Sequence, residues 1–70
     1  MPEVEIMKYS ELKKLLKKNG CRFDHEGARH EIWFSPKTGL YFPVGRHNNE
    51  DCPKGTLHSI LKDAGLKRGV

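Results

Sequence analysis

The sequence has few cysteines, no long apolar run and no internal repeats. These absences exclude several classes of protein. Its two cysteines, Cys21 and Cys52, lie far apart without a CxxC spacing, so one disulfide is possible but a disulfide framework is not. No charged segment precedes an apolar run, and the longest apolar runs are far too short to cross a bilayer. We therefore expect no signal peptide, no membrane association and a reduced, cytosolic protein with free thiols.

The length of the chain limits the number of domains, and its net charge indicates the kind of binding partner. Seventy residues form one domain at most, residues 1–70, with its core at about 7–66. A chain this short buries only roughly 60% of its unfolded surface, so we expect modest stability. Lysine and arginine outnumber aspartate and glutamate by 13 to 9, which gives a net charge of +4. This moderate excess favours an anionic partner, either a nucleic acid or an acidic protein surface.

The first strong pattern predicts a helix over residues 10–19. Three leucines between residues 12 and 16 repeat at helical spacing, Ser10 is a good N-cap, and Gly20 suits a left-handed helix end. The other side of this helix carries four lysines: Lys13, Lys14, Lys17 and Lys18. These lysines form either a phosphate-binding face or a solvated helix face, and the solvated face is the commoner case.

Three short segments alternate at period two and predict an antiparallel meander: residues 21–25, 29–35 and 40–44. Turn residues separate them, and Pro43 demotes the third segment to an edge strand or ends it early. Residues 1–7 also alternate, as either a short edge strand or a partly ordered leader.

A second helix is predicted after the polar loop 45–51. The apolar residues from Leu57 to Ala64 follow the i, i+3, i+4, i+7 pattern, and Gly65 ends the helix. The predicted order is thus helix, three strands, helix. Two amphipathic helices can cover one face of a three-stranded antiparallel sheet. We therefore expect a small α+β sandwich like a double-stranded-RNA-binding domain, with the other sheet face open to solvent or a partner.

Residues 27–34 carry the strongest chemical signal. Arg29 can hold a phosphate by charge-assisted hydrogen bonds, and His30 can exchange a proton near neutral pH, which together suit work on a phosphodiester. The alternative is a solvated histidine at the end of a strand, because such neighbours also occur by chance. Trp33 is either a base-stacking residue or a core residue.

Four motifs carry a family resemblance and run in order from residue 7 to residue 66. They are SELKKLL at 10–16 followed by Asn19-Gly20, Gly27-Ala28-Arg29-His30 before a strand, Phe42-Pro43-Val44, and CPKGTLHSILKDAGL at 52–66. In these motifs the sequence resembles the HicA family, small toxins of toxin–antitoxin pairs that act as ribonucleases on messenger RNA. The last motif is the most specific.

The resemblance implies a function and a site. It implies that His30 is the catalytic histidine, that the fold is the RNA-binding-type sandwich, and that a HicB-type antitoxin covers the active face. Many family members read Gly-Ser-His, whereas Ala28 and Arg29 precede His30 here. Arg29 therefore either replaces the serine hydroxyl or contributes nothing.

The expected reaction needs neither metal nor cofactor. A ribonuclease can use the 2′-hydroxyl of its substrate as nucleophile, given a base, an acid and positive charge on the phosphate. His30 is the candidate base or acid, and Arg29, Arg46 and Lys54 are the candidate phosphate ligands. His47 is either the second proton-transfer group or an exposed loop residue.

Three other interpretations stay open at this point. One is a non-catalytic RNA- or DNA-binding module of the same fold. Another is a zinc module built from Cys21, Cys52 and two histidines, although these spacings fit no compact zinc pattern. The third is a structural protein that only binds a partner.

Overall fold

The computed structural model describes residues 7–66, which form two helices and five strands. In chain order these are β1 (Met7–Lys8), α1 (Tyr9–Lys18), β2 (Arg22–Glu26), β3 (Glu31–Ser35), β4 (Leu40–Val44), β5 (Asp51–Cys52) and α2 (Lys54–Ala64). The predicted order of helix, three strands and helix is confirmed, and two short strands add to it.

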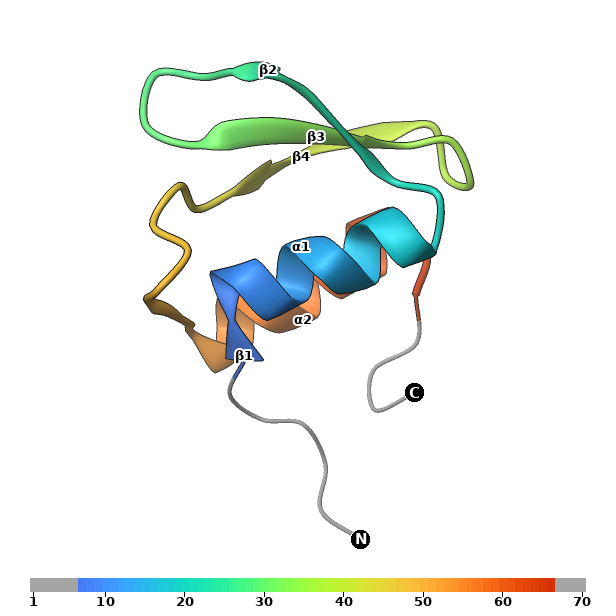
Figure 1. The fold of residues 1–70 in the computed structure, drawn as a ribbon. Coiled ribbons are helices and arrows are strands. Elements are labelled where there is room, and N and C mark those ends of the chain that lie inside the picture. Colours follow the sequence, from blue (N-terminus) through green and yellow to red (C-terminus); the bar gives the residue numbers. More distant parts are fainter. Residues whose placement is uncertain (1–6, 67–70) are drawn as a thin grey trace, which may run out of the picture.

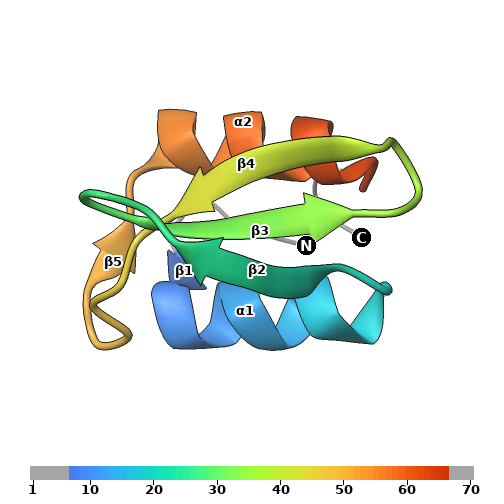
Figure 2. The ribbon, with the colours of Figure 1, turned by 90° about the horizontal axis from the view of Figure 1, so that it is seen from above.

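The main sheet has the strand order β2-β3-β4, and both of its strand pairs are antiparallel. Both helices lie against the same face of this sheet, as Figures 1 and 2 show. This arrangement confirms the predicted α+β sandwich. Tyr41 of β4 is 60% exposed and contacts Phe34 of β3, with the ring centroids 4.8 Å apart. Their strand neighbours Trp33 and Phe42 are buried in the core, so alternation places these two rings on the sheet face that neither helix covers.

The buried core fills the space between the sheet and the helices. Its members are mostly aliphatic and aromatic side chains: Tyr9, Leu12, Leu16, Cys21, Trp33, Phe42, Val44, Cys52, Leu57, Ile60, Leu61 and Ala64. Trp33 is only 2% exposed, so of its two interpretations, base stacking and core packing, the structure shows core packing. Cys21 and Cys52 are buried free thiols, as expected. The described part of the chain holds no helix long and apolar enough to cross a membrane.

The pairing of β1 with β5 corrects the predicted loop at 45–51. Met7 pairs with Cys52 and Lys8 pairs with Asp51, so the end of that loop is a strand. Two residue pairs are too short to produce an alternating pattern, which is why the sequence gives no sign of them. Of the segment 1–7, only Met7 lies within the described residues. Because β1 leads into α1 and β5 into α2, this pairing brings the starts of both helices to one end of the sheet (Figure 1).

The predicted N-cap of α1 is wrong, whereas the predicted helix ends are right. Lys8 is the N-cap residue and no side chain caps the helix. Instead, the backbone N–H groups of Tyr9 and Ser10 donate to the carbonyls of Glu50 and Asn48, at 3.0 and 3.1 Å. These long-range bonds satisfy two of the backbone donors at the start of the helix, which begins at Tyr9, before the serine that was predicted to cap it. Each helix ends at a glycine with positive φ, +90° at Gly20 and +80° at Gly65.

Candidate nuclease site

His30 lies in the tight turn that joins β2 to β3, just before the strand in which it was predicted. The N–H of Gly27 donates to the carbonyl of His30 at 2.8 Å and closes this turn. A Cβ atom on residue 27 would lie 2.7 Å from the same carbonyl oxygen and 3.2 Å from Cγ1 of Ile32. Only glycine therefore fits at position 27, and it fixes the place where His30 leaves the sheet.

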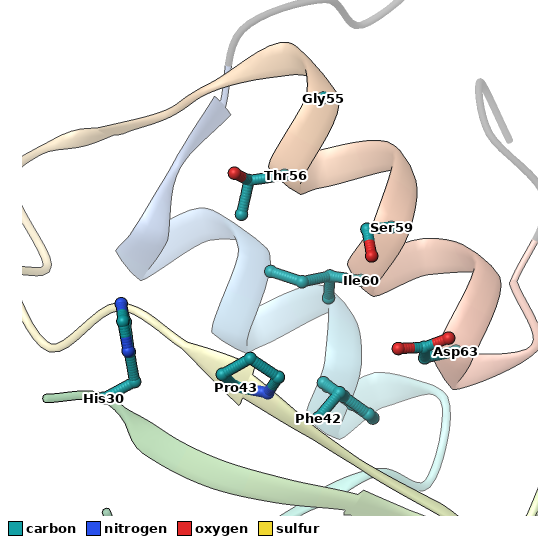
Figure 3. Close-up of a pocket in the computed structure, with 8 residues that line it drawn as sticks. All are labelled: His30, Phe42, Pro43, Gly55, Thr56, Ser59, Ile60 and Asp63. Carbon is teal, nitrogen blue, oxygen red and sulfur yellow. The ribbon is translucent and has the colours of Figure 1, made fainter. Parts of the chain in front are cut away.

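A surface cavity of about 390 Å³ lies between β4 and α2, and His30 forms part of its wall. The lining residues come from the His30 turn, from β4 and from α2: His30, Phe42, Pro43, Gly55, Thr56, Ser59, Ile60 and Asp63. Figure 3 shows His30 on the side of the first turn of α2 and Asp63 on the opposite side. The cavity thus brings a proton-transfer group and the start of a helix into one space.

The first turn of α2, which lines this cavity through Gly55 and Thr56, has backbone donors without partners in the helix. The first hydrogen bond of the helix runs from the N–H of Leu57 to the carbonyl of Pro53, at 2.8 Å. The N–H groups of Lys54, Gly55 and Thr56 precede it and so have no partner within the helix. No side chain caps this end, and the helix dipole adds partial positive charge there. Such a terminus suits a phosphate group.

Gly55 leaves the backbone accessible at this position. A Cβ atom built on Gly55 would have no other atom within 4 Å, so nothing inside the protein requires a glycine here. A glycine that packing does not explain fits a close approach of a ligand to the backbone. Lys54 is exposed at the same helix end, so its ammonium group can add charge to the site.

Arg46 lies at the His30 turn, but its guanidinium is already engaged. Its Nε lies 2.9 Å from Oε1 of Glu26, and another of its nitrogens donates to the carbonyl of Gly27. Arg46 therefore links the loop after β4 to the end of β2 and the His30 turn, a role that the sequence did not indicate. Arg29 is exposed and forms no ion pair among residues 7–66. His47 is exposed too and does not line the cavity.

A second feature that the sequence did not indicate is an ion pair beside His30. Nζ of Lys13 lies 3.1 Å from Oε1 of Glu31, and Nε1 of Trp33 donates to that oxygen at 3.0 Å. Burial alone would raise the pKa of Glu31, but the bonds from Trp33 and Lys13 and the charges of Lys13 and Arg46 hold this pKa below its ordinary value. The side chain of Lys13 is only 11% exposed, so of the two alternatives for the four lysines the solvated face does not include Lys13, whereas the other three are exposed.

The polar residues that α2 contributes to the cavity were missed as well. Thr56, Ser59 and Asp63 follow one another at intervals of three and four residues, which places them on one side of the helix. That spacing was a readable signal, but only the packing of α2 on β4 shows what the side faces. Within residues 7–66, no three histidine, cysteine or acidic side chains lie close enough to hold a metal ion.

Comparison with known proteins identifies the family. No curated protein and no solved structure matches the chain with significance. A family model does match, over residues 9–66, and its description reads "HicA toxin of bacterial toxin-antitoxin". This match spans both helices, the whole of the main sheet and every residue that lines the cavity. The chain therefore belongs to the HicA family, the toxins of bacterial toxin–antitoxin systems.

Proposed function

We propose that this toxin is a ribonuclease that cleaves messenger RNA in the cavity between β4 and α2, with His30 as its catalytic residue. One observation carries the proposal: His30 shares this cavity with the uncapped first turn of α2. A proton-transfer group and a phosphate-binding helix end are two of the components that phosphodiester cleavage needs. Membership of a toxin family supplies the biological setting.

The arrangement supports a reaction that uses the 2′-hydroxyl of the RNA as nucleophile. The scissile phosphate binds at the N–H groups of Gly55 and Thr56, which stabilise the negative charge that develops on its oxygens. The 2′-oxygen forms a bond to phosphorus while the bond from phosphorus to the 5′-oxygen breaks. His30 either takes the proton of the 2′-hydroxyl or gives a proton to the departing 5′-oxygen, and a water molecule of the open cavity exchanges the other proton. No step requires a metal ion.

Two cationic side chains complete the proposed phosphate site. Lys54 lies at the start of α2, and Arg29 lies next to His30 and is exposed. Both can add charge-assisted contacts to the phosphate or to its neighbours along the strand. Arg29 takes the place where many family members carry a serine, so Arg29→Ala tests whether the arginine contributes. Unchanged turnover and unchanged RNA affinity would remove Arg29 from the site.

The test is cleavage of a defined single-stranded RNA in the presence of EDTA. We expect the parent protein to cleave and His30→Ala to be inactive, while His58→Ala cleaves like the parent. His58 is an exposed histidine of α2 that does not line the cavity, so it controls for the loss of a surface imidazole. His30 is exposed too, so its removal should change the free energy of unfolding by no more than about 0.5 kcal/mol.

The second candidate function is a non-catalytic nucleic-acid-binding module with the same fold. Its support is the net charge of +4. The same assay separates the two functions, because a binding module would retain RNA without cleaving it. Equal cleavage by the parent and by His30→Ala would show that His30 is not the catalytic residue.

The proposed partner is a HicB-type antitoxin in the cytosol. An antitoxin that neutralises this toxin would need to cover the cavity or to displace His30. Its binding should therefore shield the His30 ring from diethylpyrocarbonate, a reagent that modifies accessible histidines. Unchanged modification of His30 in the complex would place the antitoxin elsewhere on the toxin.

A further inference from the structure

We infer that the end of the cavity remote from His30 is a base-recognition subsite, in which Asp63 selects nucleobases that carry an exocyclic amino group. The inference rests on the proposed function, since it assigns the second half of the same cavity. It names what the site reads in an RNA strand, whereas His30 and the start of α2 act on the backbone.

The two ends of the cavity differ in electrostatic character. Thr56 and Asp63 are seven residues apart on α2, which corresponds to about 10 Å along the helix axis. The Thr56 end carries the positive pole of the helix and the neighbouring Lys54. The Asp63 end carries a carboxylate, and no cation pairs with it among residues 7–66. A phosphate is attracted to the first end and repelled from the second.

The group that binds beside Asp63 must therefore be uncharged and must donate hydrogen bonds. Phe42 and Ile60, which are 1% and 2% exposed, give the cavity an apolar floor, and Pro43 adds an exposed ring at its edge. Figure 3 shows Ser59 and Asp63 on the helix side of this floor. An apolar floor bordered by a hydroxyl and a carboxylate suits an unstacked base of a single strand.

Backbone contacts hold the Asp63 segment in place without using its carboxylate. Thr38 Oγ1 donates to the carbonyl of Asp63 at 2.6 Å, and Ser35 Oγ donates to the carbonyl of Ala64 at 2.8 Å. Both hydroxyls come from the sheet layer, so the end of α2 is fixed against the sheet. The Asp63 side chain is thus held at the cavity by its backbone, while its oxygens remain acceptors for a ligand.

The hydrogen-bonding capacity of the Asp63 carboxylate determines which nucleobases the subsite prefers. Ionised aspartate can only accept hydrogen bonds, and exocyclic amino groups are its partners on bases. Adenine, cytosine and guanine carry such a group. Uracil carries none: its one base donor, the N3–H group, lies between two carbonyl oxygens, and the carboxylate repels both of them. A favourable base contact of this kind should change affinity by about fivefold or more.

The experiment measures binding of short fluorescent oligoadenylate, oligocytidylate and oligouridylate to the His30→Ala protein, which should not cleave them. We expect the first two to bind at least about fivefold more tightly than oligouridylate. Asp63→Asn should reduce this preference, because its Oδ1 still accepts from amino groups while its Nδ2 also donates to the carbonyl oxygens of uracil. Asp63→Glu should keep it, because the carboxylate is retained. Glu11→Gln, which removes an exposed carboxylate from α1, should change all three affinities by the same factor.

The outcomes separate this inference from the proposed function. Equal base preference in Asp63→Asn and Glu11→Gln would overturn the subsite, even if the parent protein cleaves RNA. A preference that depends on Asp63 in a parent protein without cleavage would support the subsite and overturn the nuclease. Absence of RNA binding would overturn both. Only backbone atoms of Asp63 make the hydrogen bonds described here, so Asp63→Asn should unfold at the same denaturant concentration as the parent.

Discussion

Gly55→Ala should make the protein more stable and less active at once. Gly55 is the second residue of α2, and its φ is not in the left-handed region. A Cβ atom there would have no neighbour within 4 Å, so alanine adds no clash. Alanine loses less backbone entropy than glycine on folding, so the free energy of unfolding should rise by about 0.5–1 kcal/mol. For a chain of this size that raises Tm by roughly 2–8 °C.

Activity should change in the opposite direction, because Cα–Cβ bonds of a helix tilt towards its N-terminus. The new methyl group would occupy the space from which a phosphate approaches the N–H groups of α2. Losing one such donor costs an enzyme on the order of 10² in rate, and we expect kcat/KM for RNA to fall at least about tenfold.

Urea denaturation and single-turnover cleavage of one RNA measure the two effects of this substitution. Ser10→Ala, at the second residue of α1 and outside the cavity, is the matched control. A stabilised variant that cleaves RNA like the parent would refute the phosphate site at Gly55. A variant with a lower free energy of unfolding than the parent would show that the space around a Cβ atom at position 55 is not open.

Three further predictions concern groups around the site and the core. The pKa of Glu31 is lower in the folded protein than in the unfolded chain, where it is about 4.3, so the ionised carboxylate stabilises the fold above that pH. This stabilisation is lost as the pH falls through the pKa of the folded protein. Glu31→Gln should therefore make the free energy of unfolding depend less on pH in acid. It should also cost about 1–2 kcal/mol at neutral pH, because it weakens a part-buried pair with Lys13. Burial, with a hydrogen bond to Cys52, raises the pKa of Tyr9 to about 12. The free energy of unfolding should therefore decline as the pH rises from about 10, where the tyrosine of the unfolded chain ionises, through that value, and ultraviolet difference titration of the wild type against Tyr9→Phe checks it. Arg46→Ala should speed amide exchange in the His30 turn, and unchanged exchange would show that the link through Arg46 is dispensable.

The helices were predictable because their signals are local. Leu12 and Leu16 are fully buried at helical spacing, and glycines with positive φ end both helices. Strand positions were predictable to within one or two residues, since β2 and β3 begin one and two residues later than expected. The β1–β5 pair was not predictable, because two residues carry no period. The start of α1 was mispredicted because the helix begins at Tyr9, where the distant carbonyls of Glu50 and Asn48 accept from its first N–H groups.

The site was predictable only where one motif carried it. His30 stands in a motif of four residues, and the same motif contains Gly27, which closes its turn. The partner of His30 across the cavity, the first turn of α2, lies more than twenty residues later in the chain. That proximity depends on how α2 packs on β4, and no local pattern encodes it. The Lys13–Glu31 pair joins positions 18 residues apart and was hidden for the same reason.

The contacts of Arg46 bear on which arginine would bind a phosphate in the proposed site. Arg46 contacts the Glu26 carboxylate and the Gly27 carbonyl, so binding a phosphate with the same nitrogens would release the turn that positions His30. Arg29 faces no such conflict, because its side chain is exposed and pairs with no acid among residues 7–66. The two substitutions should therefore differ in kind. Arg29→Ala should weaken RNA affinity and reduce its salt dependence, whereas Arg46→Ala should lower the rate of cleavage with less effect on affinity. If both substitutions lowered RNA affinity equally, Arg46 would have to be counted among the phosphate-binding residues.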